Sequence, residues 1–147
     1  MISGRSQKEG YQPKWISLLT QLNISGRIVK RGSDEMGRYT WIQLNGKNNK
    51  KVIIITAYRV CKAGNSIGTH TAHMQQVKHL LQKGMVTPNA RKEMIKDLGE
   101  MIKEHLSEGR GVILMLYSNE EWEKKSQGDM SEFLLATQLK GILKARR

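Results

Sequence analysis

The sequence contains little cysteine, proline or aromatic residue, and it has few acidic residues for its number of basic ones. A single cysteine, Cys61, among 147 residues excludes an intramolecular disulfide, so a fold of this length depends on a hydrophobic core. One cysteine beside eight methionines predicts an intracellular protein. No apolar run approaches the ~20 residues that span a bilayer, and the first residues lack a signal-peptide core. We therefore expect a soluble protein with no membrane partner.

The shortage of acidic residues has the largest consequence for function. Twenty-five Lys and Arg stand against thirteen Asp and Glu, which gives a formal net charge of +12. Counterion release favours the binding of such a protein to a polyanion, and nucleic acid, DNA or RNA, is the expected partner. Three Trp, four Tyr and one Phe give little support to a platform on which the bases of a single strand would stack. The basic residues are suited to phosphate contacts rather than to reading bases.

The pattern of apolar residues predicts strands in the first half of the chain and mainly helices in the second. Residues 15–22 fit a strand or a short helix equally well. Further strands are expected over residues 26–30, 38–44, 50–60 and 111–117, and helices over 69–83, 90–108 and 129–139. We predict a single α/β domain of the layered α+β kind over residues 14–139, a mixed sheet with helices packed on it. A flexible polar arm (1–13) precedes it and a basic tail (140–147) follows.

Polar side chains follow two apolar runs of this predicted sheet. The runs at 52–55 and 112–116 are interpreted as central strands covered on both faces. The connection between them is long enough to be a crossover, which would place the two strands side by side and parallel. Their carboxyl ends then bring together Tyr58, Arg59, Tyr117, Ser118 and Asn119. Many α/β enzymes hold catalytic groups at such an edge, but the first residue after the second run is Tyr117 rather than a carboxylate.

Other patterns of catalytic or metal-binding residues are weak. His70 and His73 lie three residues apart in a predicted helix, with His79 further along, but no cysteine or carboxylate has a matching spacing. We expect no metal site there. No Gly-Lys-Ser/Thr phosphate loop occurs, and no serine or cysteine nucleophile has a histidine at a usable spacing.

Several short motifs occur in the order and spacing of a known family. They are Tyr11-Gln12-Pro13, Arg31-Gly32-Ser33-Asp34, Gly37-Arg38-Tyr39, the run 53–61 (IIITAYRVC), the run 71–76 (TAHMQQ), Pro88-Asn89-Ala90-Arg91 and the run 112–120 (VILMLYSNE). Together they resemble the central part of endonuclease/exonuclease/phosphatase-like domains of the retroelement-associated type. The resemblance extends from about Gly10 to Phe133. It implies a layered α/β sandwich and metal-dependent cleavage of DNA or RNA.

The resemblance also implies roles for single residues. Tyr58 is similar to the tyrosine that approaches the scissile phosphate, and Asn119 to the Asn of an Asp-x-Asn motif that helps to hold it. Tyr117 occupies the Asp position, where a phenol that is neutral near pH 7 cannot replace a carboxylate as a Mg²⁺ ligand. The family's upstream metal-binding Asn and Glu and its closing Asp-His pair have no counterpart here. We therefore expect a truncated, degenerate and catalytically inactive nuclease-like domain without a cofactor, with Tyr58 and Asn119 marking a vestigial site.

Seven basic residues are predicted to contact phosphate: Lys30, Arg38, Arg59, Lys62, Lys144, Arg146 and Arg147. Two alternatives stay open. One is an active Mg²⁺-dependent endonuclease whose missing ligands come from a partner chain, an oligomer, or Glu120 and Asp34. The other is a structural interaction subunit of a larger assembly. Sheet edges left uncovered by the truncation favour a homo-oligomer or a larger complex in every case.

Overall fold

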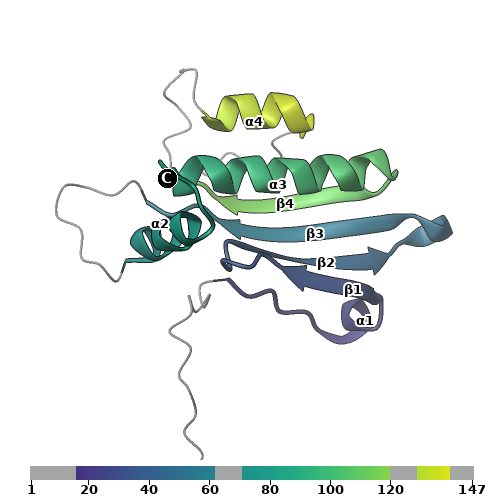
Figure 1. Cartoon of the computed structure of the whole chain (residues 1–147). Helices are drawn as coiled ribbons and strands as arrows, with labels where there is room; N and C mark the ends of the chain where they lie inside the picture. The colour runs from purple at the N-terminus through teal and green to yellow at the C-terminus, as the bar shows by residue number, and fades with distance from the viewer. Residues whose placement is uncertain (1–15, 62–70, 120–128, 140–147) are drawn as a thin grey trace, which may run out of the picture.

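The structure, a computed structural model, describes residues 16–61, 71–119 and 129–139. The predicted arm and basic tail therefore lie outside the described residues, as do Lys62, His70, Glu120, Lys144, Arg146 and Arg147. The elements in chain order are α1 (Leu22–Ser25), β1 (Ile28–Ser33), β2 (Tyr39–Asn45), a short 3₁₀ turn (Lys47–Asn49), β3 (Lys51–Tyr58), α2 (Ala72–Gln82), α3 (Ala90–Ser107), β4 (Gly111–Tyr117) and α4 (Asp129–Thr137) (Figure 1). None of the helices in these ranges combines the length and the apolar character that a membrane crossing requires.

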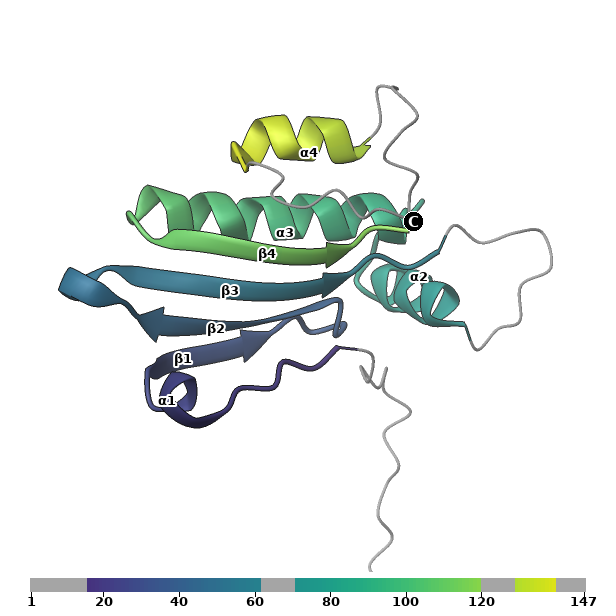
Figure 2. The same cartoon turned by 180° about the vertical axis from the view of Figure 1, so that it is seen from behind.

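The four strands form one mixed sheet in the order β1-β2-β3-β4. The first three pair antiparallel as a meander, whereas β3 and β4 pair parallel, with Tyr58 beside Tyr117. Parallel neighbours need a long crossover, which α2 and α3 supply (Figures 1 and 2). The structure thus confirms the predicted mixed sheet with helices packed on it and the predicted parallel pair.

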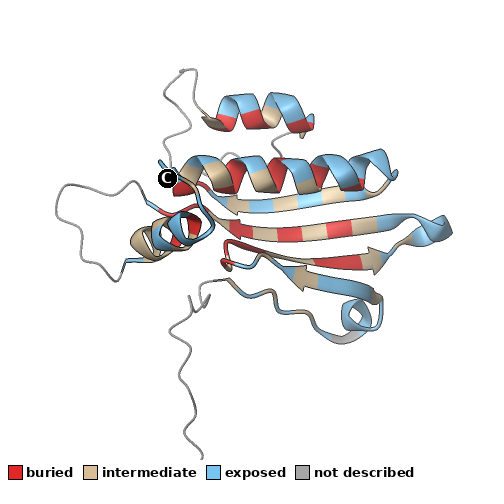
Figure 3. Cartoon of the chain, viewed as in Figure 1, coloured by how far each residue is buried: buried red, intermediate tan, exposed pale blue. Residues whose placement is uncertain are grey.

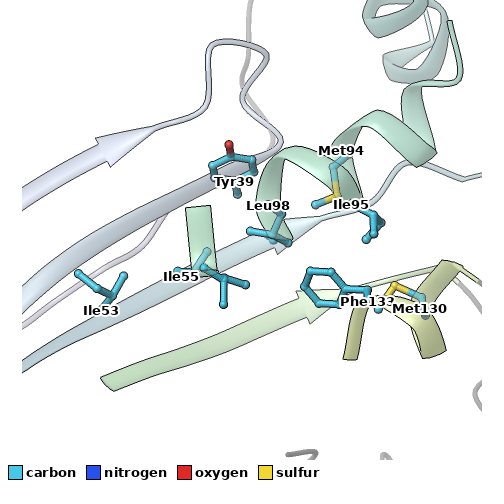
Figure 4. Close-up of a cluster of buried hydrophobic side chains, with 10 residues drawn as sticks. Tyr39, Ile53, Ile55, Met94, Ile95, Leu98, Met130 and Phe133 are labelled. Atoms are coloured by element: carbon cyan, nitrogen blue, oxygen red, sulfur yellow. The ribbon is translucent and has the colours of Figure 1, made fainter. Parts of the chain in front are cut away.

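The hydrophobic core lies between one face of the sheet and the helices α3 and α4. Alternate residues of β3 point into it, and Ile53 and Ile55 are fully buried. Leu98 of α3 and Phe133 of α4 belong to the same cluster (Figure 4). Ile102 of α3 joins it. A smaller cluster holds α2, where Leu80 packs with Met36 and Ala90. The apolar stripe that predicted α3 is therefore its buried face.

The position of β4 differs from the sequence prediction. This strand was expected to be central, but it lies at the edge of the described sheet. Exposed and half-buried residues alternate along β4 (Figure 3). Its exposed residues Ile113, Met115 and Tyr117, at 48, 49 and 65 %, alternate with those that pack against the core and so lie on the opposite face. An unbroken apolar run resembles a strand buried on both faces, and the pattern alone does not report that the second face is open.

Residues 16–25 partly cover that open face. Residues 16–21 have no regular structure and lead into the four-residue helix α1, so the segment is neither a strand nor a helix along most of its length. Leu18, Leu19 and Ile24 line one side of an open hollow of about 440 Å³, and Ile42, Ile54 and Met115 of the strands line the other. The cover reaches Met115 of β4, which is still about half exposed, and Ile113 and Tyr117 lie outside the hollow.

Candidate nucleic-acid interface

The polar groups predicted to converge at the carboxyl ends of β3 and β4 do so. The rings of Tyr58 and Tyr117 stack with centroids 5.8 Å apart and planes 9° apart. Asn119 follows in a left-handed conformation (φ 52°), and its Nδ2 donates a hydrogen bond of 2.5 Å to the carbonyl of Arg59. Parallel register causes this, because Tyr58 and Tyr117 are direct partners in the ladder.

Tyr58 is a neutral group in this arrangement. Burial raises the pKa of its phenol, a hydrogen bond with Asn119 lowers it, and contact with Cys61 raises it again, with a net shift upward. The Tyr58 hydroxyl lies 3.9 Å from the Cys61 sulfur. The described residues of this site, Tyr58, Tyr117, Ser118 and Asn119, therefore offer an aromatic surface and neutral hydrogen-bonding groups.

Arg59 ties the end of β3 to the helices instead of facing solvent. It is 1 % exposed, and its Nη2 donates to Asp129 at the start of α4 over 2.8 Å. Its Nε donates to the carbonyl of Arg91 in α3 over 3.3 Å. A phosphate in solution cannot reach this guanidinium, so the structure replaces the predicted phosphate contact with a structural one.

Arg38 is similarly enclosed at the start of β2. It is 3 % exposed, and it donates to Asp34 over 2.7 and 2.8 Å and to Asp97 of α3 over 2.6 Å. Burial lowers the pKa of Arg38, but the hydrogen bonds and charges of the two carboxylates raise it by more. The net shift is upward, so the guanidinium stays charged. For the acid Asp34 burial acts in the opposite direction and raises the pKa, but the hydrogen bonds and charge of Arg38 lower this pKa by more, to below its ordinary value. Arg38 therefore holds the β1–β2 turn to α3 and is no phosphate ligand.

Six other basic residues gather where β2 turns into β3 and along β1. We call them the hairpin-end basic cluster: Arg27, Lys30, Arg31, Lys47, Lys50 and Lys51. Asn45 brings the segments together, because its backbone N–H donates to the carbonyl of Arg27 over 3.0 Å and its strand partner is Lys51. All six side chains are exposed. Across the described ranges, none of the six takes part in an ion pair.

The cluster stands in a segment that is otherwise poor in acid. Residues 16–61 carry eight Lys and Arg against two Asp and Glu, a net charge of +6, whereas residues 71–119 and 129–139 carry seven of each. The two acids of the first segment are engaged, Asp34 with Arg38 and Glu35 with Lys83. Of the predicted phosphate contacts, only Lys30 belongs to the cluster. The other five residues had a signal in the sequence, because residues 16–33 and 36–60 contain no acid at all.

The histidines and carboxylates of the described part do not form a metal-binding group. His73 and His79 lie on α2, and His79 Nε2 is 3.5 Å from Glu35. No three or more His, Cys, Asp or Glu side chains among the described residues are placed to hold a metal ion together. Asp34, considered above as a ligand, accepts hydrogen bonds from Arg38 on both carboxylate oxygens.

Comparison of the chain with protein-family models, with curated proteins and with solved structures finds no match. The resemblance to endonuclease/exonuclease/phosphatase-like domains therefore stays a prediction from short motifs.

Proposed function

We propose that this protein binds nucleic acid, DNA or RNA, through the hairpin-end basic cluster, as a degenerate nuclease-like domain that binds without cleaving. One observation carries the proposal: among the described residues, six exposed basic side chains without ion-pair partners lie at the hairpin end of the sheet and along the adjoining strand β1, and the meander has no unpaired acid. Such a surface attracts polyanions, and Lys and Arg contacts to phosphate release counterions. The contacts are independent of base sequence.

Exposed basic residues can also protect the edge of a sheet, and the positions of the six residues in the cluster distinguish that role from nucleic-acid binding. Basic residues on an edge strand also prevent pairing with other chains, and Lys30 and Arg31 lie on such a strand. Lys47 and Lys50 do not, since they lie in the loop between β2 and β3. Charges in that loop protect no edge, so they favour a polyanion as partner.

The carboxyl edge supports binding rather than cleavage. Tyr117, at the position where the resembled motif has a carboxylate, stacks on Tyr58, and Asn119 bonds to the backbone. The alternative in which Asp34 supplies a Mg²⁺ ligand requires Asp34 to leave Arg38, which would strand a buried guanidinium.

Salt dependence of binding tests the proposal. Fluorescence anisotropy with labelled DNA and RNA should show affinity falling about 10³-fold between ~50 and ~200 mM salt if six phosphates are contacted on duplex. Absence of binding to either polymer at the lower salt concentration would exclude the proposal.

A cleavage assay distinguishes the proposed domain, which binds without cleaving, from the alternative of an active Mg²⁺-dependent endonuclease. Supercoiled plasmid and labelled RNA incubated with the protein and Mg²⁺ or Mn²⁺ should stay intact. Cleavage by the wild type that is abolished in Asn119→Ala would contradict the proposal that the domain is inactive and would establish an enzyme at the carboxyl edge.

A further inference from the structure

One face of the sheet carries an exposed column of side chains that the core does not use. Val112, Leu114 and Leu116 of β4 pack against the core, so the alternate residues Ile113, Met115 and Tyr117 lie on the other face, and Tyr117 is the most exposed of these at 65 %. The segment 16–25 lies over Ile42, Ile54 and Met115 but leaves Met115 about half exposed, and Ile113 and Tyr117 lie outside the hollow. The face is therefore open along one edge.

The ring of Tyr117 stacks on a neighbouring ring on that face. Its ring lies parallel to the ring of Tyr58 on the neighbouring strand, at 5.8 Å between centroids, and Tyr58 is itself half-buried. Among the described residues no strand lies beyond β4, so Tyr117 is the outer member of the pair. A parallel pair with an open outer side is suited to accept a third planar ring in the same stack.

The same face also carries a cation of the hairpin-end basic cluster. Arg31 of β1 is the strand partner of Ile42, and that row continues through Ile54 to Ile113 on β4. Arg31 therefore lies on the same face as the β4 column, about 14 Å from Ile113 at ~4.8 Å per strand. Tyr117 lies four residues further along β4, so it is about 20 Å from Arg31 at ~3.3 Å per residue, a distance that several nucleotides of an extended strand span. The hydroxyls of Thr40 and Thr56, paired in the next row, lie between β1 and β4. A chain that alternates anionic groups with planar rings matches this arrangement.

We propose that Tyr117, stacked on Tyr58, binds a base of a single-stranded nucleic acid whose phosphates are held by Arg31 and its neighbours in the hairpin-end basic cluster. This inference rests on the proposed function and narrows it from nucleic acid to single strands. Bases in a duplex are stacked on each other and cannot lie on a tyrosine, whereas unpaired bases stack on exposed aromatic side chains. The charge of the chain, +12, favours this occupant of the exposed column over another basic protein surface.

Tyr117 variants test the inference. A fluorescein-labelled strand of mixed sequence is compared with the same strand annealed to its complement, using the full chain. The wild type should bind the single strand more tightly, and Tyr117→Ala should weaken that binding about tenfold, within the range for one base–aromatic stack. Tyr117→Phe, which keeps the ring, should bind like the wild type. Leu135→Ala, at an 81 % exposed position on α4, is the control.

The salt slope distinguishes stacking from a change in charge. Tyr117→Ala should lower affinity for the single strand without changing the slope, because it removes no cation. Circular dichroism verifies that each variant is folded. If the wild type prefers duplex, or if Tyr117→Ala binds the single strand as the wild type does, the inference is wrong while the proposed function stands. If Tyr117→Ala instead converts an oligomer to a monomer with binding unchanged, the column is a protein contact and the inference is likewise wrong. If no nucleic acid binds at low salt, the proposed function itself fails.

Discussion

The two ends of the strand meander use basic residues in opposite ways. At the carboxyl end of β3, Arg38 and Arg59 are 3 and 1 % exposed and donate to Asp34, Asp97 and Asp129. At the hairpin end, Lys47, Lys50 and Lys51 are exposed and have no ion-pair partner among the described residues. A buried charge is tolerated only when it is paired, whereas an exposed, unpaired one can bind a ligand. The number of basic residues therefore predicts a polyanion partner, but only their burial shows which of them can meet it.

Replacement of Arg38 should have the largest effect on stability. Arg38→Gln leaves the carboxyl of Asp34 buried without its partner, and breaking a buried ion pair in this way costs about 3–5 kcal/mol. Lys47→Gln, the matched change at the hairpin end, should shift the free energy of unfolding by less than ~0.5 kcal/mol. Urea unfolding followed by circular dichroism measures both. Equal effects of the two variants would contradict the division between structural and free cations.

A smaller destabilisation is expected from substitution of Gly32 in β1, because the ring of Trp41 on β2 lies directly against the Gly32 backbone. A Cβ at Gly32 would lie 2.7 Å from the indole of Trp41, which packs against His105 of α3. Gly32→Ala should therefore cost about 1–3 kcal/mol by overpacking. Gly26→Ala, where a Cβ would meet nothing within 4 Å, is the matched control. If Gly32→Ala leaves the free energy of unfolding unchanged, then β1, which carries Lys30 and Arg31, does not pack against Trp41 as described.

The decrease in the free energy of unfolding at acid pH should depend on the Arg38–Asp34 pair. The folded pKa of Asp34 lies below its ordinary value of 3.8, so the pair contributes stability that is fully present above that pH. This contribution disappears as pH falls through the folded pKa, because the protonated carboxyl no longer attracts Arg38. Asp34→Asn should be less stable than the wild type at neutral pH, and the difference should shrink below about pH 4. A difference between the two proteins that grows on acidification would contradict this assignment.

Much of the fold was predictable because its signals are local. The periodic stripe of α3 and the β-branched residues of β3 indicated the order of elements, and the long crossover indicated the parallel pair. The meeting of Tyr58, Tyr117 and Asn119 followed from that pairing. The edge position of β4 did not, since an apolar run does not reveal how many neighbours its strand has.

The burial of Arg38 and Arg59 depends on distant partners. Arg38 binds Asp97, 59 residues away, and Arg59 binds Asp129, 70 residues away. Nothing in the residues next to either arginine distinguishes it from an exposed one. The hairpin-end basic cluster was closer to being predictable, because all six of its residues lie in two acid-free stretches, 16–33 and 36–60, and only antiparallel pairing is needed to join them.

The measurement that tests the central claim most directly compares two triple variants with the same net charge. One replaces Lys47, Lys50 and Lys51 with Gln at the hairpin end, and the other replaces the exposed Lys92, Lys96 and Lys103 of α3 with Gln. Affinity for labelled duplex DNA is measured by anisotropy over ~50 to ~200 mM salt, and each phosphate-binding cation that is removed should reduce the slope of log affinity against log salt by about 0.9. We predict that the hairpin-end variant binds more weakly with a slope smaller by about 2.7, and that the α3 variant keeps nearly the wild-type slope. Equal reductions in the two variants would mean that binding follows net charge alone and would contradict the assignment of this surface.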